Sequence, residues 1–219
     1  MAFLFPVAFS CTSGGGSASR RILALGDSYT IGEAVSAPER WPNQLAALLK
    51  KEGIEAADPE IIARTGWTTD ELDRAIDAAA PAGPYDLVTL LIGVNNQYRG
   101  RPGDEYRREF GVLLQRAIGF AGGDASRVLV LSIPDWGVTP FAADRDRGKI
   151  GEEIDLFNRV NREEADRLGA RYVDVTPVSR TAATDAALIA SDGLHPSGAM
   201  YARWAELSLP AARAALLRR

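Results

Sequence analysis

Residues 85–92 read Tyr-Asp-Leu-Val-Thr-Leu-Leu-Ile and are followed at once by Gly-Val-Asn-Asn at positions 93–96. The run is nearly continuous in apolar residues, which is typical of a strand that is buried on both faces. Glycine and asparagine directly after it indicate a turn at the carboxyl end of that strand. This stretch therefore predicts a parallel sheet that is covered by helices on both sides.

Four further segments have the length and composition of short strands: residues 21–25, 60–63, 127–133 and 171–175. Apolar residues recur with helical spacing in five other segments: residues 39–51, 68–81, 104–120, 151–168 and 198–217. Strands that alternate with helices predict a three-layer α/β/α domain over residues 20–219. We expect its five parallel strands to follow the flavodoxin-like order 2-1-3-4-5.

Two parts of the chain have a less regular pattern. Residues 134–149 show no clear period, and their length suits either a mobile lid over a binding site or an ordinary surface excursion. Pro210 lies inside the last helical segment. We expect it to interrupt that helix, because proline lacks a backbone N–H and clashes with the preceding turn.

The composition argues against several classes of function. The formal net charge is −4 and no basic block stands out, which disfavours a nucleic-acid partner. No apolar run reaches the roughly 18–20 residues that span a bilayer. The chain has one histidine and one cysteine, so a zinc site or another metal site with nitrogen and sulfur ligands is not expected. A site of oxygen ligands for magnesium or calcium stays open.

The first 19 residues differ from all that follows. Positions 1–9 are almost wholly apolar, Cys11 comes next, and residues 12–19 are rich in serine and glycine. This order resembles a bacterial lipoprotein signal and predicts an exported protein with a lipid anchor at Cys11. No lysine or arginine precedes the apolar run, so a cytoplasmic protein with an irregular start is the alternative.

Polar or glycine-containing turns follow each of the first three predicted strands. The turns are Gly-Asp-Ser at 26–28, Thr-Gly-Trp-Thr at 65–68 and the Gly-Val-Asn-Asn already quoted. Ordinary strand-to-helix turns favour the same residue types, so one such turn means little. In the predicted strand order, however, Ser28, Gly66 and Asn95 converge at the carboxyl edge of the sheet, where open α/β sheets bind ligands.

Residues 191–195, Ser-Asp-Gly-Leu-His, hold the only histidine of the chain. Asp192 lies three positions before His195, so one tight turn allows its carboxylate to accept a hydrogen bond from the imidazole. Acyl transfer needs a nucleophile and a base of this kind, and Ser28 is the candidate nucleophile. Asp27, next to Ser28, is the other candidate for the acid that orients His195. We interpret its carboxylate instead as a local cap of the turn.

Acyl transfer also needs hydrogen-bond donors for the oxyanion of the tetrahedral intermediate. The backbone N–H groups of Ser28 and Gly66 and the side-chain amide of Asn95 are predicted to supply them. No Gly-x-Ser-x-Gly elbow is present, which disfavours the α/β-hydrolase fold. Activity is expected to fall in acid, because only a neutral imidazole can act as the base.

Four motifs in this order resemble those of the SGNH hydrolases, also called GDSL esterases and lipases, and cover about residues 21–217. They are Gly26-Asp27-Ser28-Tyr29, Gly66 within Arg-Thr-Gly-Trp-Thr-Thr, Gly93-Val94-Asn95-Asn96 and Asp192-Gly193-Leu194-His195-Pro196. The resemblance implies a serine hydrolase with a Ser28–His195–Asp192 triad, an oxyanion hole of Ser28, Gly66 and Asn95, and no cofactor. The family usually has aspartate where this chain has Asn96, which is not a catalytic position.

The predicted reaction is hydrolysis of a carboxylic ester through an acyl-enzyme, with a short acyl group preferred. Glycan or lipid esters remain open as substrates, so a carbohydrate O-deacetylase, a lysophospholipase or a thioesterase is an alternative. A binding module without catalytic activity is a more distant alternative. Trp67, Tyr98, Trp136 and also Phe141 fall in or near loops that follow strands, where they can line a substrate pocket. Arg99 is interpreted as a solvated loop arginine, with an anionic substrate group as the alternative partner.

Overall fold

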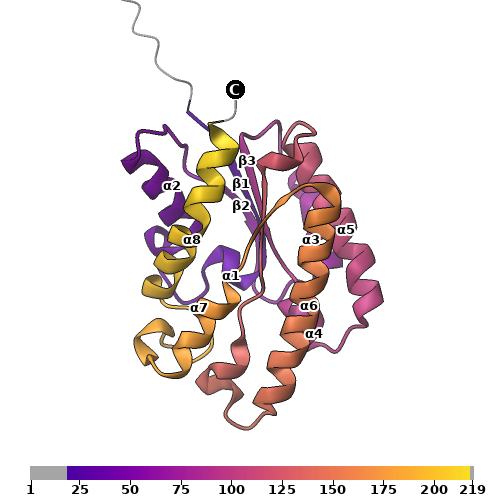
Figure 1. Cartoon of the computed structure of the whole chain (residues 1–219), viewed down its shortest axis with the longest axis vertical. Coiled ribbons are helices and arrows are strands. Elements are labelled where there is room, and N and C mark those ends of the chain that lie inside the picture. Colours follow the sequence, from indigo (N-terminus) through magenta and orange to yellow (C-terminus); the bar gives the residue numbers. More distant parts are fainter. Residues whose placement is uncertain (1–18, 218–219) are drawn as a thin grey trace, which may run out of the picture.

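A computed structural model describes residues 19–217 of the protein (Figure 1). The predicted signal segment and the lipid anchor at Cys11 lie outside the described residues. Five parallel strands form one sheet in the order β2-β1-β3-β4-β5, which confirms the predicted topology. The strands are β1 Ile22–Gly26, β2 Glu60–Ala63, β3 Leu87–Leu91, β4 Val128–Leu131 and β5 Arg171–Val173.

Helices cover both faces of this sheet, which gives the three layers that Figure 1 shows. One face carries α2 (Trp41–Lys51) and α8 (Gly198–Leu216), which pack against each other. The other face carries α3 (Thr69–Ala79), α5 (Gly103–Phe120) and α6 (Arg147–Leu168). Three short helices lie near the carboxyl ends of the strands: α1 (Ser28–Ile31), α4 (Val94–Tyr98) and α7 (Thr176–Arg180).

Several connections contain single turns of 3₁₀ helix. These are η1 Ala37–Glu39, η2 Ala125–Arg127, η3 Trp136–Val138, η4 Pro140–Ala142, η5 Thr181–Ala183 and η6 Ala186–Leu188. Two of them, η3 and η4, give local order to the segment 134–149, for which the sequence showed no period. α6 also begins within that segment, four residues before the predicted start, because the Asp146 carboxylate caps it by accepting from the backbone N–H of Lys149 at 3.0 Å.

The central strands explain the nearly continuous apolar run at residues 85–92. All residues of β1, β3 and β4 are buried, whereas the edge strands β2 and β5 keep partly exposed positions. Burial of both faces removes the alternation of apolar and polar residues that a half-exposed strand would show.

The predicted interruption at Pro210 is wrong, since α8 continues through it to Leu216. Trp204, Ser208 and Ala212 are spaced by four residues on either side of the proline and are all fully buried. One continuous packed stripe therefore holds both halves of the helix in line, while Pro210 itself faces solvent. This packing offsets the loss of one backbone hydrogen bond.

The register of the sheet aligns the ends of the first three strands. Gly26, the last residue of β1, is paired with Ala63 of β2 and with Leu91 of β3. Only glycine fits there, because a Cβ atom would lie 2.2 Å from Thr30 Oγ1 and 2.4 Å from the Leu91 carbonyl oxygen. The chain thus leaves three neighbouring strands at one level, and the residues that follow are brought together.

Within residues 19–217, no helix is long and apolar enough to cross a membrane. The same part of the chain contains no group of three His, Cys, Asp or Glu side chains arranged to hold a metal ion.

Candidate active site

Ser28 is the first residue of α1 and comes two positions after the end of β1. Its neighbour Asp27 caps that helix, because the Asp27 Oδ1 atom accepts a hydrogen bond from the backbone N–H of Tyr29 at 3.0 Å. The sequence interpretation of Asp27 as a cap of the turn agrees with this contact. Ser28 is 5% exposed, so only a small part of it faces the cleft described below.

His195 is held by Asp192 through both oxygens of the carboxylate. The Nδ1 atom of the imidazole donates to Asp192 Oδ2 at 2.6 Å. The backbone N–H groups of His195 and Leu194 donate to Asp192 Oδ1 at 2.9 Å and 3.0 Å. Gly193 adopts a φ of 73°, which lets the chain curl so tightly between the two residues. One carboxylate thereby fixes both the turn and the orientation of the ring.

The protein shifts the pKa values of Asp192 and Asp27 in opposite directions. Burial raises the pKa of Asp192, but hydrogen bonds from His195 and from the turn outweigh it and hold that pKa below its ordinary value. Complete burial raises the pKa of Asp27 from 3.8 to about 7, against the hydrogen bond from Tyr29. Among the described residues, the second oxygen of Asp27 has no hydrogen-bond partner. The carboxylate at His195 is therefore the one that is stabilised as an anion.

The second and third sequence motifs meet in the loop between β2 and α3. Gly66 has a φ of 88°, in the left-handed region that favours glycine. Asn95 comes from the first turn of α4, and its Nδ2 atom donates to the Trp67 carbonyl oxygen at 2.9 Å. An amide nitrogen carries two hydrogens, so one N–H of Asn95 stays available for another acceptor.

Asn96, which follows Asn95 in the third motif, is fully buried and binds the start of α3. Its Oδ1 accepts from the Thr69 backbone N–H at 3.1 Å, and its Nδ2 donates to the Thr69 hydroxyl at 2.7 Å. The same hydroxyl donates its only proton to Glu109. An amide suits position 96 because the hydroxyl is already used as a donor and can only accept there. The sequence did not reveal this role, since Thr69 and Glu109 are remote from Asn96 along the chain.

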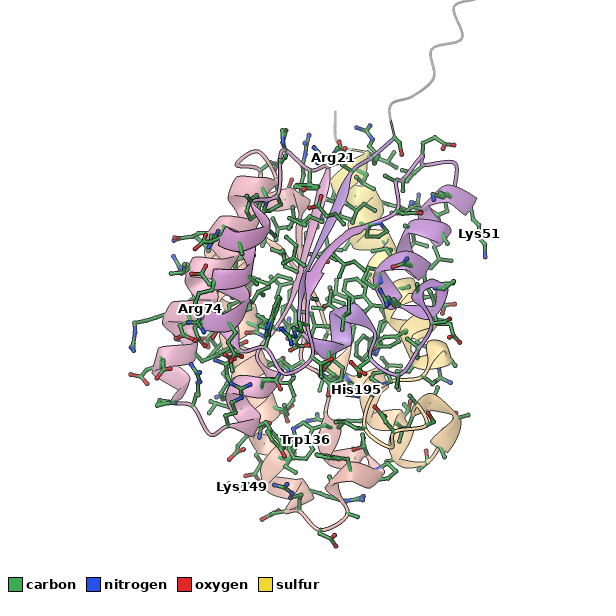
Figure 2. The ribbon with its side chains drawn as sticks, turned by 180° about the vertical axis from the view of Figure 1, so that it is seen from behind. Arg21, Lys51, Arg74, Trp136, Lys149 and His195 are labelled. Atoms are coloured by element: carbon green, nitrogen blue, oxygen red, sulfur yellow. The ribbon has the colours of Figure 1, made fainter. Side chains whose placement is uncertain are left out.

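One cleft of about 190 Å³ brings the predicted residues together. Its lining residues are Ser28, Tyr29, Thr65, Gly66, Val94, Asn95, Tyr98, Trp136, Phe141, Leu194 and His195. Figure 2 labels His195 and Trp136, which lie beyond the same end of the sheet, opposite to Arg21 at the start of β1. Among the described residues, the Ser28 hydroxyl makes no hydrogen bond to another side chain, although it shares this cleft with His195.

Of the aromatic residues predicted to contact substrate, Tyr98, Trp136 and Phe141 line the cleft, and Trp67 does not. The Trp67 side chain packs against the hydrophobic core instead. The other three rings contact one another, with centroids 5.5 to 6.4 Å apart, and we call them the aromatic rim. Tyr98 and Phe141 are 46% and 45% exposed, whereas Trp136 beneath them is buried.

Trp136 and the segment 134–149 are fixed to the rest of the site. The indole Nε1 of Trp136 donates to Gln97 Oε1 at 2.9 Å, and the Gln97 amide donates in turn to Glu153 at 2.7 Å. The Phe141 backbone N–H donates to the Gly193 carbonyl, inside the Asp192–His195 turn, at 3.0 Å. The segment thus forms one wall of the cleft and is hydrogen-bonded to the turn that carries His195.

The comparisons with known proteins agree with this geometry at the level of the class, which is that of carboxylic ester hydrolases. Residues 24–203 match the model of the GDSL-like lipase/acylhydrolase family. The chain belongs to this family. The matched residues include all four motifs and every residue that lines the cleft.

Individual relatives are more distant. An arylesterase of Vibrio mimicus is 31% identical over 99 residues, which are 44% of this chain and 48% of that protein. The match therefore spans about half the length of this relative. The crystal structure of TesA has a TM-score of 0.70 at 20% identity, covering 90% of this chain and 100% of that one. Axe2, an acetylxylan esterase from Geobacillus stearothermophilus, has a TM-score of 0.63 at 18% identity, covering 91% and 95%. At these identities the two structures show a shared fold.

Proposed function

We propose that the protein hydrolyses small carboxylic esters with Ser28 as the nucleophile, His195 as the base and Asp192 as the residue that orients His195. The observation that carries this proposal is the shared cleft. Ser28, Gly66, Asn95 and His195 all line it, and the carboxylate behind His195 lies 2.6 Å from its Nδ1. Nucleophile, base and oxyanion donors are the three requirements of acyl transfer.

In the proposed reaction, His195 accepts the proton of Ser28 through Nε2 while the serine oxygen attacks the ester carbonyl. The backbone N–H groups of Ser28 and Gly66 and the free N–H of Asn95 stabilise the oxyanion. The imidazolium then protonates the leaving alcohol, and a water molecule that His195 activates releases the acid. Hydrogen bonds between nucleophile and base are often long in a free enzyme and shorten when substrate binds, which fits the unbonded Ser28 hydroxyl.

The test is Ser28→Ala against p-nitrophenyl acetate, together with labelling by a fluorophosphonate. We expect the variant to lose at least about 10³-fold in kcat/KM and all labelling. Ser126→Ala is the matched control, because Ser126 lies at the amino end of β4, away from the cleft, and we expect it to keep wild-type activity. Equal turnover by Ser28→Ala and wild type would refute the nucleophile assignment.

A carbohydrate O-deacetylase is the second candidate, and the aromatic rim favours it. Two rings that are nearly half exposed beside the cleft offer flat faces on which a sugar can pack. Acetate release from acetylated xylan, compared with fatty-acid release from a lysophospholipid, distinguishes this activity from that of a lipid esterase. Faster acetate release supports the deacetylase, and faster fatty-acid release contradicts it.

Export with a lipid anchor at Cys11 also stays a proposal, which rests on the sequence of residues 1–19 alone. Mass spectrometry of the amino terminus in the native host tests it. A chain that begins with a lipidated Cys11 is expected, and a chain that keeps Met1 contradicts it.

A further inference from the structure

Arg99 follows α4 directly and binds the loop that carries Gly66. One guanidinium nitrogen donates to the Gly66 carbonyl oxygen at 2.6 Å, and another donates to Glu71 Oε1 at 3.2 Å. The side chain is 42% exposed and does not line the cleft. Arg99 therefore approaches the loop from outside the substrate site. It is exposed, as expected for a solvated arginine, and it also binds the Gly66 carbonyl and Glu71.

Two consecutive carbonyl groups of this loop are held from one short helix. Arg99 binds the Gly66 carbonyl, and Asn95 binds the Trp67 carbonyl at 2.9 Å. Asn95 is the second residue of α4 and Arg99 is its C-cap. The helix that supplies the Asn95 donor thus also sets the orientation of the two peptide groups after the Gly66 N–H.

The space in the direction of a side chain at Gly66 is nearly open. A Cβ atom built there would meet only the Arg99 guanidinium, at 3.9 Å. Glycine has wide conformational freedom, so a glycine without packed neighbours keeps one conformation only where hydrogen bonds fix it. At Gly66 the bond from Arg99 is such a constraint, because it fixes the peptide group on the carboxyl side of the residue.

Glu71 connects the same arginine to the start of α3. Its Oε2 accepts from the Thr68 backbone N–H at 2.8 Å, and the Thr68 side chain accepts from the Glu71 backbone N–H, so the two residues form a capping box. The carboxylate therefore joins the cap of α3 to Arg99. The loop is tied at its carboxyl end to a helix that packs on the sheet, and Arg99 connects that end with Gly66.

We propose that Arg99 is a positioning residue that holds the Gly66 N–H in the geometry needed to stabilise the oxyanion. This inference rests on the proposed function of the cleft. Donors must be placed within roughly 0.5 Å to act on a transition state, and the loss of a whole donor costs about 10²–10³ in rate. If the Gly66 N–H is kept but misaligned, we expect a smaller loss than that of a whole donor, about 10- to 100-fold in kcat.

The experiment compares Arg99→Ala and Arg99→Lys with wild type, using p-nitrophenyl acetate as a neutral substrate. We expect Arg99→Ala to lower kcat about 10- to 100-fold with KM changed less than about threefold, because the interaction acts on the transition state. Arg99→Lys keeps one donor for the Gly66 carbonyl and should recover at least about fivefold of the loss. Arg64→Ala is the matched control: it removes an exposed arginine from the same loop and should leave kcat unchanged.

Two further readouts separate positioning from a general effect on the fold. Added guanidinium ion at millimolar concentration is expected to restore part of the kcat of Arg99→Ala and to leave Arg64→Ala unaffected. The pH dependence of kcat/KM should keep its shape in Arg99→Ala, because the pair formed by His195 and Asp192 is untouched. Thermal unfolding verifies that each variant is folded at the assay temperature.

The proposal is overturned if folded Arg99→Ala keeps a kcat within twofold of wild type, or if only KM rises, which would mean that Arg99 binds substrate. If Arg99→Ala does not fold, Arg99→Met takes its place, because methionine keeps an aliphatic stem and offers no donor to the Gly66 carbonyl. A kcat of folded Arg99→Met within twofold of wild type then overturns the proposal. Failure of the proposed function is seen separately, as full activity in Ser28→Ala. A lowered kcat in Arg99→Ala, with guanidinium rescue, supports the positioning role.

Discussion

The side of the cleft that carries Gly66 and Asn95, which is the proposed oxyanion side, and the aromatic rim are held in place by different kinds of contact. On the oxyanion side, Gly66 and Asn95 are fixed by hydrogen bonds between polar groups from α3, α4 and the connecting loop. At the rim, Tyr98 and Phe141 are nearly half exposed and contact each other and Trp136, and the Arg145 guanidinium lies over the Tyr98 ring. Oxyanion stabilisation requires donors at one position, whereas contact with an apolar group depends mostly on buried area. We infer that the side with Gly66 and Asn95 determines the rate of the chemical step and that the aromatic rim determines which substrates are preferred.

The largest effect on activity is expected from a change in the Asp192–His195 pair. Asp192→Asn keeps an oxygen for the turn N–H groups but no longer offers a carboxylate to His195, so the tautomer and charge of the imidazole are no longer supported. We expect kcat/KM for p-nitrophenyl acetate to fall about 10³–10⁴-fold with little change in melting temperature. Asp185→Asn, at another capping aspartate, is the control. A loss below tenfold would remove Asp192 from the mechanism.

Asp27, the buried neighbour of the proposed nucleophile Ser28, provides a test by the pH dependence of stability. Its folded pKa of about 7 lies above the unfolded value of 3.8, so the folded state binds the proton more tightly. The stability that it contributes is present below pH 3.8 and is lost as pH rises through 7. Between pH 5 and 8, wild type should therefore lose about 2–3 kcal/mol relative to Asp27→Asn, whose side chain does not titrate.

Urea denaturation of both proteins at the two pH values measures this difference. The Asn variant keeps the oxygen that accepts from Tyr29, so the helix cap is matched. Parallel stability–pH curves for the two proteins would mean that Asp27 is not ionised within this range.

A smaller effect is expected at Asn96. In Asn96→Asp, two carboxylates compete for the single proton of the Thr69 hydroxyl, because Glu109 already accepts it. We expect the free energy of unfolding to fall by about 1–3 kcal/mol. Glu109→Gln should relieve the competition, so the double variant should lose less stability than the sum of the two single variants.

Additive losses in this double-mutant cycle would show that position 96 tolerates aspartate without regard to Glu109. The cycle thus tests whether the polar network on the oxyanion side depends on this exact pairing.

The smallest effect is expected at the rim. Phe141→Ala removes one exposed ring and should lower kcat/KM about three- to tenfold for p-nitrophenyl octanoate, and less than twofold for the acetate. Leu207→Ala on α8 is the control, because Leu207 is equally exposed but distant from the cleft-lining residues. An equal loss on both esters would contradict the division between reaction and substrate recognition.

Most of the fold and the outline of the candidate site were predictable from local patterns. Continuous apolar runs identify strands that are buried on both faces, and alternation with helices determines the parallel sheet. Glycine and polar residues after the strands then mark the carboxyl edge, where Ser28, Gly66 and Asn95 lie together. The Asp192–His195 contact was predictable because it spans only three residues.

Predictions failed where contacts between remote residues decide the structure. α8 passes through Pro210 because its buried stripe packs on α2 and the sheet, which outweighs a local preference. Trp67 packs in the core and Phe141 faces the cleft, although both aromatic residues lie in loops. Loop position alone does not tell which way a side chain points.

By itself, then, the sequence determined the layers and the four motifs, because each depends on residues that are close together along the chain. The strand order was predictable from the flavodoxin-like topology that alternating strands and helices favour. Only the tertiary structure decided the contacts of Arg99 with Gly66 and Glu71, the pairing of Asn96 with Thr69 and Glu109, and the rings that form the rim. These depend on side chains from different helices that meet at distances of a few ångströms. Such meetings follow from the packing of whole elements, which no local pattern encodes.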